Sequence, residues 1–259
     1  MSQAFGDQVL LLAERSVVRT LRQPANVVFP LVFPLLLLAV NAGGLDSATR
    51  LPGFPTDSFV AFALAIPFIQ GALFATMNAG TDLARDIQTG FLNRLSLTPM
   101  RGVALLAGQL GGVVTMGLVQ ALVYLGVGLA VGVRLESGPL GALVLFAFAV
   151  VVSIGFGALG AFAALRTGSS EAVQGLFPVF FVFLFISSMS MPRDLIEIDW
   201  FRVAATANPV SYLIECVRSL IITGWDGEAL ALGFGIAGAI MVVALALAAT
   251  SLRTRLARS

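Results

Sequence analysis

Long apolar segments alternate with short polar connections along the chain. Six mainly apolar runs occupy residues 26–45, 58–80, 102–132, 139–165, 172–191 and 229–252. At a rise of about 1.5 Å per residue, a helix of about 20 apolar residues crosses the roughly 30 Å hydrocarbon core of a bilayer. The pattern therefore predicts an all-α polytopic membrane protein, with six transmembrane helices in one domain over residues 1–259.

The amino-acid composition excludes several classes of function. Hydrophobic residues make up 58% of the chain and charged residues 11%, far below the roughly 25% typical of a soluble domain. Lysine and histidine are absent, which excludes a P-loop and histidine-based zinc or proton-relay sites. Cys216 is the single cysteine, so an intrachain disulfide is excluded as well. We expect no catalytic residue, metal or cofactor on this chain, and no nucleic acid as a partner.

The charges in the connections predict an orientation. With the N-terminus in the cytoplasm, ten of the 15 arginines fall on the cytoplasmic side, and nine of the 14 acidic residues fall outside. This distribution follows the positive-inside rule. We expect both termini in the cytoplasm and the chain in the cytoplasmic (inner) membrane of a bacterium.

Residues 1–25 predict an amphipathic helix that lies on the membrane surface before the first span. An apolar face runs through Val9 and Val17, and the opposite face carries a basic stripe of Arg15, Arg19 and Arg22. A helix of this kind rests in the interface, where its arginines meet anionic lipid headgroups. An ordinary cytosolic amphipathic helix is the alternative.

The connection at 81–101, between the second and third spans, is longer than a turn. An apolar residue recurs at every fourth position, namely at Leu83, Ile87, Phe91 and Leu95. This period predicts a short helix. Asp82 and Asp86 are expected near its start, where the helix dipole favours acids, and Pro99 is expected to close it.

The external segment at 192–227 is too charged to span a membrane and too apolar for an ordinary loop. Asn208–Pro209 breaks it, and the following residues predict a helix from Val210 to Thr223 with one apolar face, formed by Leu213, Val217 and Leu220. We expect a re-entrant element that dips into the outer leaflet, which requires protein to cover its backbone. A plain external loop is the alternative.

Acidic residues and arginines are missing from the interiors of the proposed spans, which argues against proton-driven transport. Two other features are candidates for a translocation path. Pro67 and Gln70 lie near the middle of the second span, and Phe177 and Phe181 belong to an aromatic cluster in the fifth. A kink near Pro67 could accommodate gating, and the aromatic cluster could line a path for a lipid-like or aromatic substrate. Contact of the cluster with lipid or with neighbouring helices is the alternative.

Two stretches resemble a known family. Residues 82–99 read DLARDIQTGFLNRLSLTP, which resembles the coupling helix of ABC-2 type permeases, especially the daunorubicin-resistance branch. Residues 208–218 read NPVSYLIECVR and are similar to the N-P-x-x-Y…R element that precedes the last span of that family. The helix before the first span matches the elbow helix. One departure is Asn93, where the family often has an acid.

The resemblance implies the permease subunit of an ATP-driven exporter of drug-like or lipid-like molecules. It would pair with a second permease chain, identical or a sister, and with two copies of an ATP-binding-cassette ATPase that binds ATP and Mg. Spans two and five would line the path. The resemblance further implies an ATPase-coupling element formed by Asp86, Gly90, Arg94 and Pro99, and an outer element that caps the exit, formed by Asn208, Pro209, Tyr212 and Arg218.

Other functions stay open on the sequence alone. The same type of permease could export a lipid-linked glycan or another envelope polymer precursor. A membrane scaffold or assembly factor, or a channel, is a candidate from a different class. An intramembrane enzyme has the least support, because the spans hold neither a histidine dyad nor a pair of aspartates.

Overall fold

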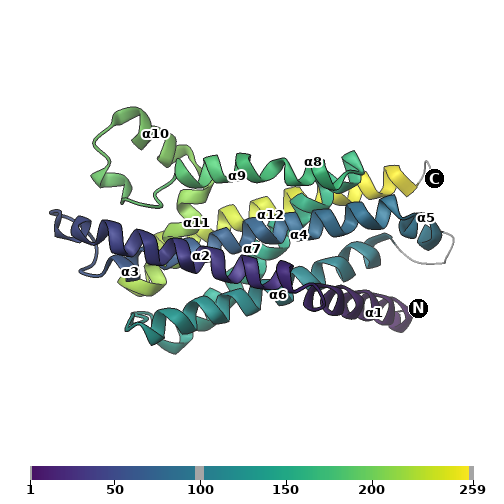
Figure 1. The fold of residues 1–259 in the computed structure, drawn as a ribbon, viewed down its shortest axis with the longest axis horizontal. Coiled ribbons are helices and arrows are strands. Elements are labelled where there is room, and N and C mark those ends of the chain that lie inside the picture. Colours follow the sequence, from purple (N-terminus) through teal and green to yellow (C-terminus); the bar gives the residue numbers. More distant parts are fainter. Residues whose placement is uncertain (1, 97–101, 257–259) are drawn as a thin grey trace.

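The computed structural model describes residues 2–96 and 102–256, and every regular element within these ranges is helical. Five segments are long and apolar enough to cross a membrane: Pro24–Arg50, Phe59–Gln88, Ala104–Ala130, Gly138–Thr167 and Gly227–Arg255. Their helices run along the long axis of the molecule, and both chain ends lie at the same end of it (Figure 1). The expected all-α architecture with several membrane-spanning helices is confirmed.

The helices fall into two groups along the chain. The first half contains α1 (Ser2–Leu21), α2 (Pro24–Leu45), η1 (Asp46–Arg50), α3 (Phe59–Ala63), α4 (Ala65–Gln88), α5 (Phe91–Ser96) and α6 (Gly102–Ala130). The second half contains α7 (Gly138–Thr167), α8 (Ser170–Gln174), α9 (Leu176–Phe185), η2 (Arg193–Leu195), α10 (Asp199–Ala207), α11 (Pro209–Arg218), η3 (Ser219–Thr223) and α12 (Gly227–Leu256).

The run expected at 172–191 does not form one long helix. It is divided into α8 and α9 at Gly175, and the chain leaves the helical conformation after Phe185. Pro178 contributes to the division, because it has no N–H to donate to the carbonyl four residues earlier. The six expected spans are thus five long segments and one shorter apolar pair of helices.

The helix at the centre of the bundle is α4, which packs most closely against α7. A Cβ atom added at Gly160 of α7 would lie 1.9 Å from the carbonyl oxygen of Thr76, and one added at Gly80 would lie 2.8 Å from that of Gly160. The two backbones therefore touch through glycine, which is how helices in membranes approach closely.

The position of the acidic residues differs from the sequence-based prediction. No new helix begins at Asp82, because α4 continues to Gln88 and is interrupted by neither proline nor glycine after Gly80. Asp82 and Asp86 therefore lie in the last two turns of α4, where the helix dipole disfavours acids. These two carboxylates need compensating charge from elsewhere in the chain.

The segment at 192–227 is mainly helical, and it is largely buried toward its C-terminal end. The predicted helix from Val210 to Thr223 corresponds to α11 and the π-helical turn η3, and its predicted apolar residues, Leu213, Val217 and Leu220, are each at most 1% exposed. These residues belong to the main hydrophobic core together with parts of α3, α4 and α7. Figure 1 places α10 and η1 at the end of the molecule opposite the chain termini.

Candidate functional site

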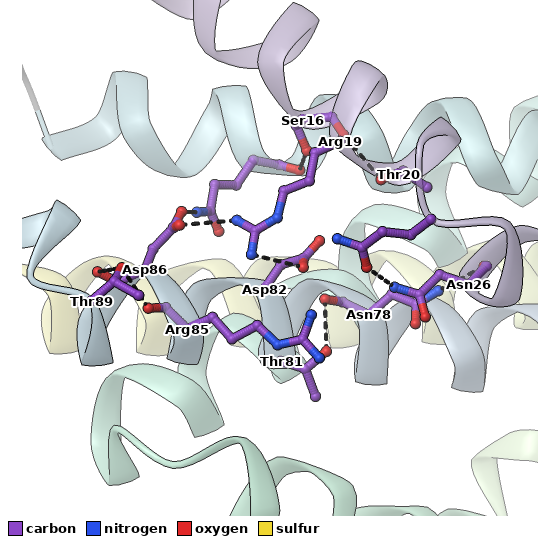
Figure 2. A network of polar contacts seen from close by, with 12 residues as sticks. Ser16, Arg19, Thr20, Asn26, Asn78, Thr81, Asp82, Arg85, Asp86 and Thr89 are labelled. Atoms are coloured by element: carbon purple, nitrogen blue, oxygen red, sulfur yellow. Dashed lines mark hydrogen bonds and ion pairs between the residues drawn. The ribbon is translucent and has the colours of Figure 1, made fainter.

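A cluster of charged side chains joins α1 to the last turns of α4. Asp82 and Asp86 are four residues apart on α4, and Arg15 and Arg19 are four residues apart on α1. Side chains with this spacing lie on the same face of a helix, so two carboxylates face two guanidinium groups. Figure 2 shows Arg19 extending from α1 toward both aspartates.

Asp86 is the centre of this cluster. Its Oδ1 accepts hydrogen bonds from Arg19 at 2.9 Å and from Arg15 at 3.1 Å. Its Oδ2 accepts from Arg15 at 3.2 Å and from the Nε2 of Gln109, on α6, at 3.2 Å. Asp82 forms an ion pair with Arg19 at 3.2 Å. We call these five residues, Arg15, Arg19, Asp82, Asp86 and Gln109, the α1–α4 clamp.

Burial makes the α1–α4 clamp energetically important. The Asp86 side chain is 7% exposed, whereas Arg15 and Arg19 retain 39% and 23% of their exposure. Two positive and two negative charges cancel, so burying the group leaves no net charge. Loss of the arginines would be costly, because the buried Asp86 carboxylate would keep neither a counterion nor access to water.

Arg15 also connects the α1–α4 clamp to α5. Its guanidinium carbon lies 4.0 Å from the centre of the Phe91 ring, at the first residue of α5. A cation at this distance from an aromatic face is attracted by the ring electrons. The position of α5 is therefore linked, through one arginine, to the position of α1.

Two sequence-based interpretations need correction here. Arg15 and Arg19 do not face outward toward lipid headgroups; they point to α4, and the exposed face of α1 instead carries Leu10 and Leu11. Asp86 is 5% exposed, and its carboxylate binds Arg15, Arg19 and Gln109 of this chain rather than lying on the surface. Arg22 is exposed, as an interfacial arginine would be. The matching spacing of acids and arginines in the sequence is a signal that could have predicted this pairing.

The remaining predicted coupling residues lie just beyond α4. Gly90 ends the helix with φ +68°, a conformation that favours glycine, and Arg94 of α5 is exposed. Pro99 and the side chain of Leu95 lie outside the described residues. The described part of this connection thus presents a short helix with an exposed arginine, at the end of the molecule that holds both termini (Figure 1).

The four path candidates do not form a single group. Pro67 lies in the first turn of α4, just after Leu64, which separates α3 from α4. Gln70 is 2% exposed inside the bundle. Phe177 and Phe181 lie half-buried on α9, with ring centres 4.4 Å apart.

The α9 phenylalanines continue into a longer aromatic row. The ring of Phe177 lies 5.7 Å from that of Phe74 on α4, which contacts the rings of Phe29 and Phe33 on α2 at 5.5 and 6.1 Å. We call Phe29, Phe33, Phe74, Phe177 and Phe181 the aromatic row. The sequence analysis missed Phe74, because the contact joins three helices that are distant in the chain.

At the opposite end, Asn208 and Pro209 fix the start of α11. The Asn208 side chain accepts a hydrogen bond from the N–H of Val210 at 2.9 Å, and Pro209 occupies the first helical position. The Nδ2 of Asn208 donates to the carbonyls of Phe183 and Ile186, which end α9. One side chain therefore caps two helices and fixes α11 to α9.

Tyr212 and Arg218 connect the outer element to its surroundings. The Tyr212 hydroxyl donates to the carbonyl of Thr206 in α10 at 2.9 Å. The buried Arg218 donates to the carbonyl of Phe62 at 3.2 Å, and to the carbonyls of Ser188 and Met189 at 3.1 Å. Burial lowers the pKa of Arg218 to about 9, which still leaves the guanidinium charged at neutral pH.

The charged and polar side chains at these sites position helices relative to one another. Within residues 2–96 and 102–256, no three acidic or cysteine side chains are grouped to hold a metal ion. Cys216 is buried, and burial raises the pKa of its thiol to about 12. The charged groups instead hold helices to one another at both ends of the bundle.

Comparison with known proteins agrees with this architecture. The model of the family described as ABC-2 type transporter matches residues 7–222. The chain is 30% identical over 203 residues to the daunorubicin resistance ABC transporter permease protein DrrB1 of Streptomyces coeruleorubidus, in an alignment that covers 75% of this chain and 66% of that protein. The chain therefore spans just under two thirds of the length of DrrB1.

Two further relatives align over more of their length. The probable doxorubicin resistance ABC transporter permease protein DrrC of Mycobacterium tuberculosis is 26% identical over 223 residues, which is 86% of this chain and 80% of that protein. The putative transport permease ycf38 of Cyanophora paradoxa is 23% identical over 219 residues, which is 83% of this chain and 74% of that protein. Since the family match includes most of the chain, this multi-pass membrane protein belongs to the ABC-2 type transporter family, whose members are non-catalytic permease subunits that work with a separate ABC ATPase.

Proposed function

We propose that this chain is the permease subunit of an exporter that moves a hydrophobic or amphipathic substrate out of the cytoplasm or the inner leaflet. The observation that carries the proposal is the family match over residues 7–222, together with the two drug-resistance permeases among its relatives. Two copies of an ATP-binding-cassette ATPase would bind ATP and Mg and supply the energy. A second permease chain, identical or a sister, would complete the path.

The end of the molecule that holds both termini is proposed to face the cytoplasm and the ATPase. The excess of arginines in the connections at that end supports this orientation. Gly90 and Arg94 would form the contact with the ATPase, together with Pro99. Asp86 would act inside the permease, because it is buried and joins α4 to α1.

The coupling would follow from these links. A displacement of α5 by the ATPase reaches Arg15 through the Phe91 ring, and Arg15 and Arg19 are bound to α4 through Asp86. Since α4 packs against α7 and α11, movement of α4 would change the packing of the bundle. ATP bound to the ATPase would drive transport by changing the difference in free energy between two arrangements of the helix bundle.

The aromatic row is proposed to border the substrate path. It lies on α2, α4 and α9, and its α9 members are only half-buried in the single chain. Phenylalanine rings give a large apolar surface without a fixed charge, which suits drug-like or lipid-like molecules. Pro67 and Gln70 lie deeper on α4 and would support this surface from behind. The outer element would cap the exit.

The proposal is tested by purifying the tagged chain from its native membrane in mild detergent and assaying the eluate for ATPase activity. We expect an ATPase subunit to co-purify in a one-to-one ratio with the permease. Arg94→Ala should keep this complex and its fold yet uncouple ATP hydrolysis from transport. Arg50→Ala, at an exposed arginine of the opposite end, is the matched control and should stay coupled. An intact chain without an ATPase partner would indicate a scaffold or a channel instead.

A further inference from the structure

The helix α2 contains two internal prolines that face the rest of the bundle. Pro30, Pro34 and Leu38 are its buried residues, and they follow one another at intervals of four along a single stripe. The other sides of α2 are open, with Val32 and Val40 more than half exposed. This first span therefore touches the bundle along one narrow line.

Each proline removes a hydrogen bond from α2. In an α-helix the N–H of a residue donates to the carbonyl four positions earlier, and proline has no N–H. Pro30 therefore leaves the carbonyl of Asn26 without its helical donor, and Pro34 does the same to the carbonyl of Pro30. Both carbonyls belong to the stripe that faces the bundle.

Side chains of two neighbouring helices donate to these two carbonyls. The Nδ2 of Asn78, on α4, donates to the carbonyl of Asn26 at 3.3 Å, and Figure 2 shows the two asparagines beside each other. The hydroxyl of Tyr124, on α6, donates to the carbonyl of Pro30 at 2.5 Å. Tyr124 is completely buried, so this carbonyl would have no access to water if the hydroxyl were removed.

We infer that α2 is a hinged helix, docked to the bundle through the two carbonyls that its own prolines release, with Asn78 and Tyr124 as its positioning residues. A helix that lacks two internal hydrogen bonds, four residues apart, bends more easily at that point. The pivot is a bend at residues 26–34, between the docked N-terminal part of α2 on α4 and α6 and its C-terminal part, which contacts the main core through Leu38. Because Phe29 and Phe33 belong to the aromatic row, the pivot lies next to the proposed substrate path; its role in transport rests on the proposed function.

The docking is tested by hydrogen exchange of the α2 amides in the purified full-length chain in nanodiscs. Tyr124→Phe removes one hydroxyl and should speed exchange in residues 25–40 roughly fivefold, the change expected for one buried hydrogen bond. Tyr212→Phe is the matched control, since it removes the other tyrosine hydroxyl bond of the chain, at α10 and α11. Tyr212→Phe should leave the hydrogen exchange of the α2 amides unchanged.

A second substitution separates docking from general loosening. Pro34→Ala supplies an N–H that can donate to the carbonyl of Pro30 from within α2, so the hydroxyl of Tyr124 is no longer needed. In the Pro34→Ala background we expect Tyr124→Phe to change α2 exchange less than twofold. An equal effect of Tyr124→Phe in both backgrounds, or no effect in either, would overturn the docking.

The pivot is tested in the complex with the partner ATPase, reconstituted in vesicles with an amphipathic fluorescent dye. Replacing both Pro30 and Pro34 by alanine restores the two helical donors and should slow α2 exchange, while lowering dye transport per ATP hydrolysed roughly fivefold. Slowed exchange with unchanged dye transport would refute the pivot. Failure of the unsubstituted complex to move any dye would instead count against the proposed function, and the exchange experiments would still decide how α2 is docked.

Discussion

Substituting Asp86 by asparagine should release α1 from α4. The change preserves the size of the side chain but replaces the carboxylate, whose oxygens accept hydrogen bonds from Arg15 and Arg19, by a neutral amide. Breaking a fully buried ion pair costs about 3–5 kcal/mol. Here both arginines are partly exposed and can return to water, and Asp82 still pairs with Arg19, so we expect a smaller cost of about 2 kcal/mol.

This cost should be seen as local opening rather than global unfolding. A loss of about 2 kcal/mol corresponds to a roughly 30-fold increase in the opening equilibrium, because about 1.4 kcal/mol is a factor of ten. Hydrogen exchange of the amides between residues 8 and 20 measures it in the purified chain. Asp7→Asn, an exposed carboxylate on the same helix, is the control and should change nothing. Protection of α1 within a factor of two of the unsubstituted chain would refute the reasoning.

The remaining predictions concern backbone contacts and buried polar groups, and each is measured as a thermal shift of the purified chain in detergent. Gly160→Ala should cost about 1–3 kcal/mol, because its Cβ would lie 1.9 Å from a backbone oxygen of α4 that cannot move aside. Gly126→Ala, where no atom lies within 4 Å, should be neutral or stabilise α6; equal effects at the two glycines would contradict the packing. Asn208→Asp keeps the cap of α11 but loses both hydrogen bonds to α9, so we expect a loss of about 2 kcal/mol, and an unchanged midpoint would argue against the double cap. Arg218→Lys should lower the stability of the fold by about 1–3 kcal/mol, because an ammonium group cannot reach three carbonyls in the geometry of a planar guanidinium. Full stability of the lysine variant would show that a positive charge alone is sufficient at this position. Gly90→Val should cost about 1–2 kcal/mol through its positive φ, and Gly90→Asn less, whereas the reverse order would contradict the backbone assignment.

Hydrophobic patterning predicted the architecture well because each span needs its own apolar length. The long segments at Pro24–Arg50 and Gly227–Arg255 correspond closely to the runs at 26–45 and 229–252. The apolar face through Leu213 and Val217 was also recognised, because helical period and burial go together. Such local patterns are sufficient to predict a helix and its buried residues where the helix buries a single face.

The sequence-based predictions were wrong where contacts between distant segments decide the outcome. Apolar content does not show where a helix ends, so the continuation of α4 to Gln88 was missed and Asp86 was assigned to a partner surface. Its two arginine partners are 67 and 71 residues away in the chain. The role of Tyr124 was missed for the same reason, since its acceptor is a backbone carbonyl 94 residues away.

The central claim is that this chain forms the membrane path of an ATP-driven exporter. It is tested most directly with inside-out vesicles that contain the chain together with its co-purified ATPase, by following the uptake of an amphipathic fluorescent dye after ATP is added. We expect ATP-dependent accumulation of the dye, which is lost in vesicles that contain the ATPase alone. Equal dye signals with and without ATP, in vesicles whose ATPase is active and bound to the chain, would contradict it.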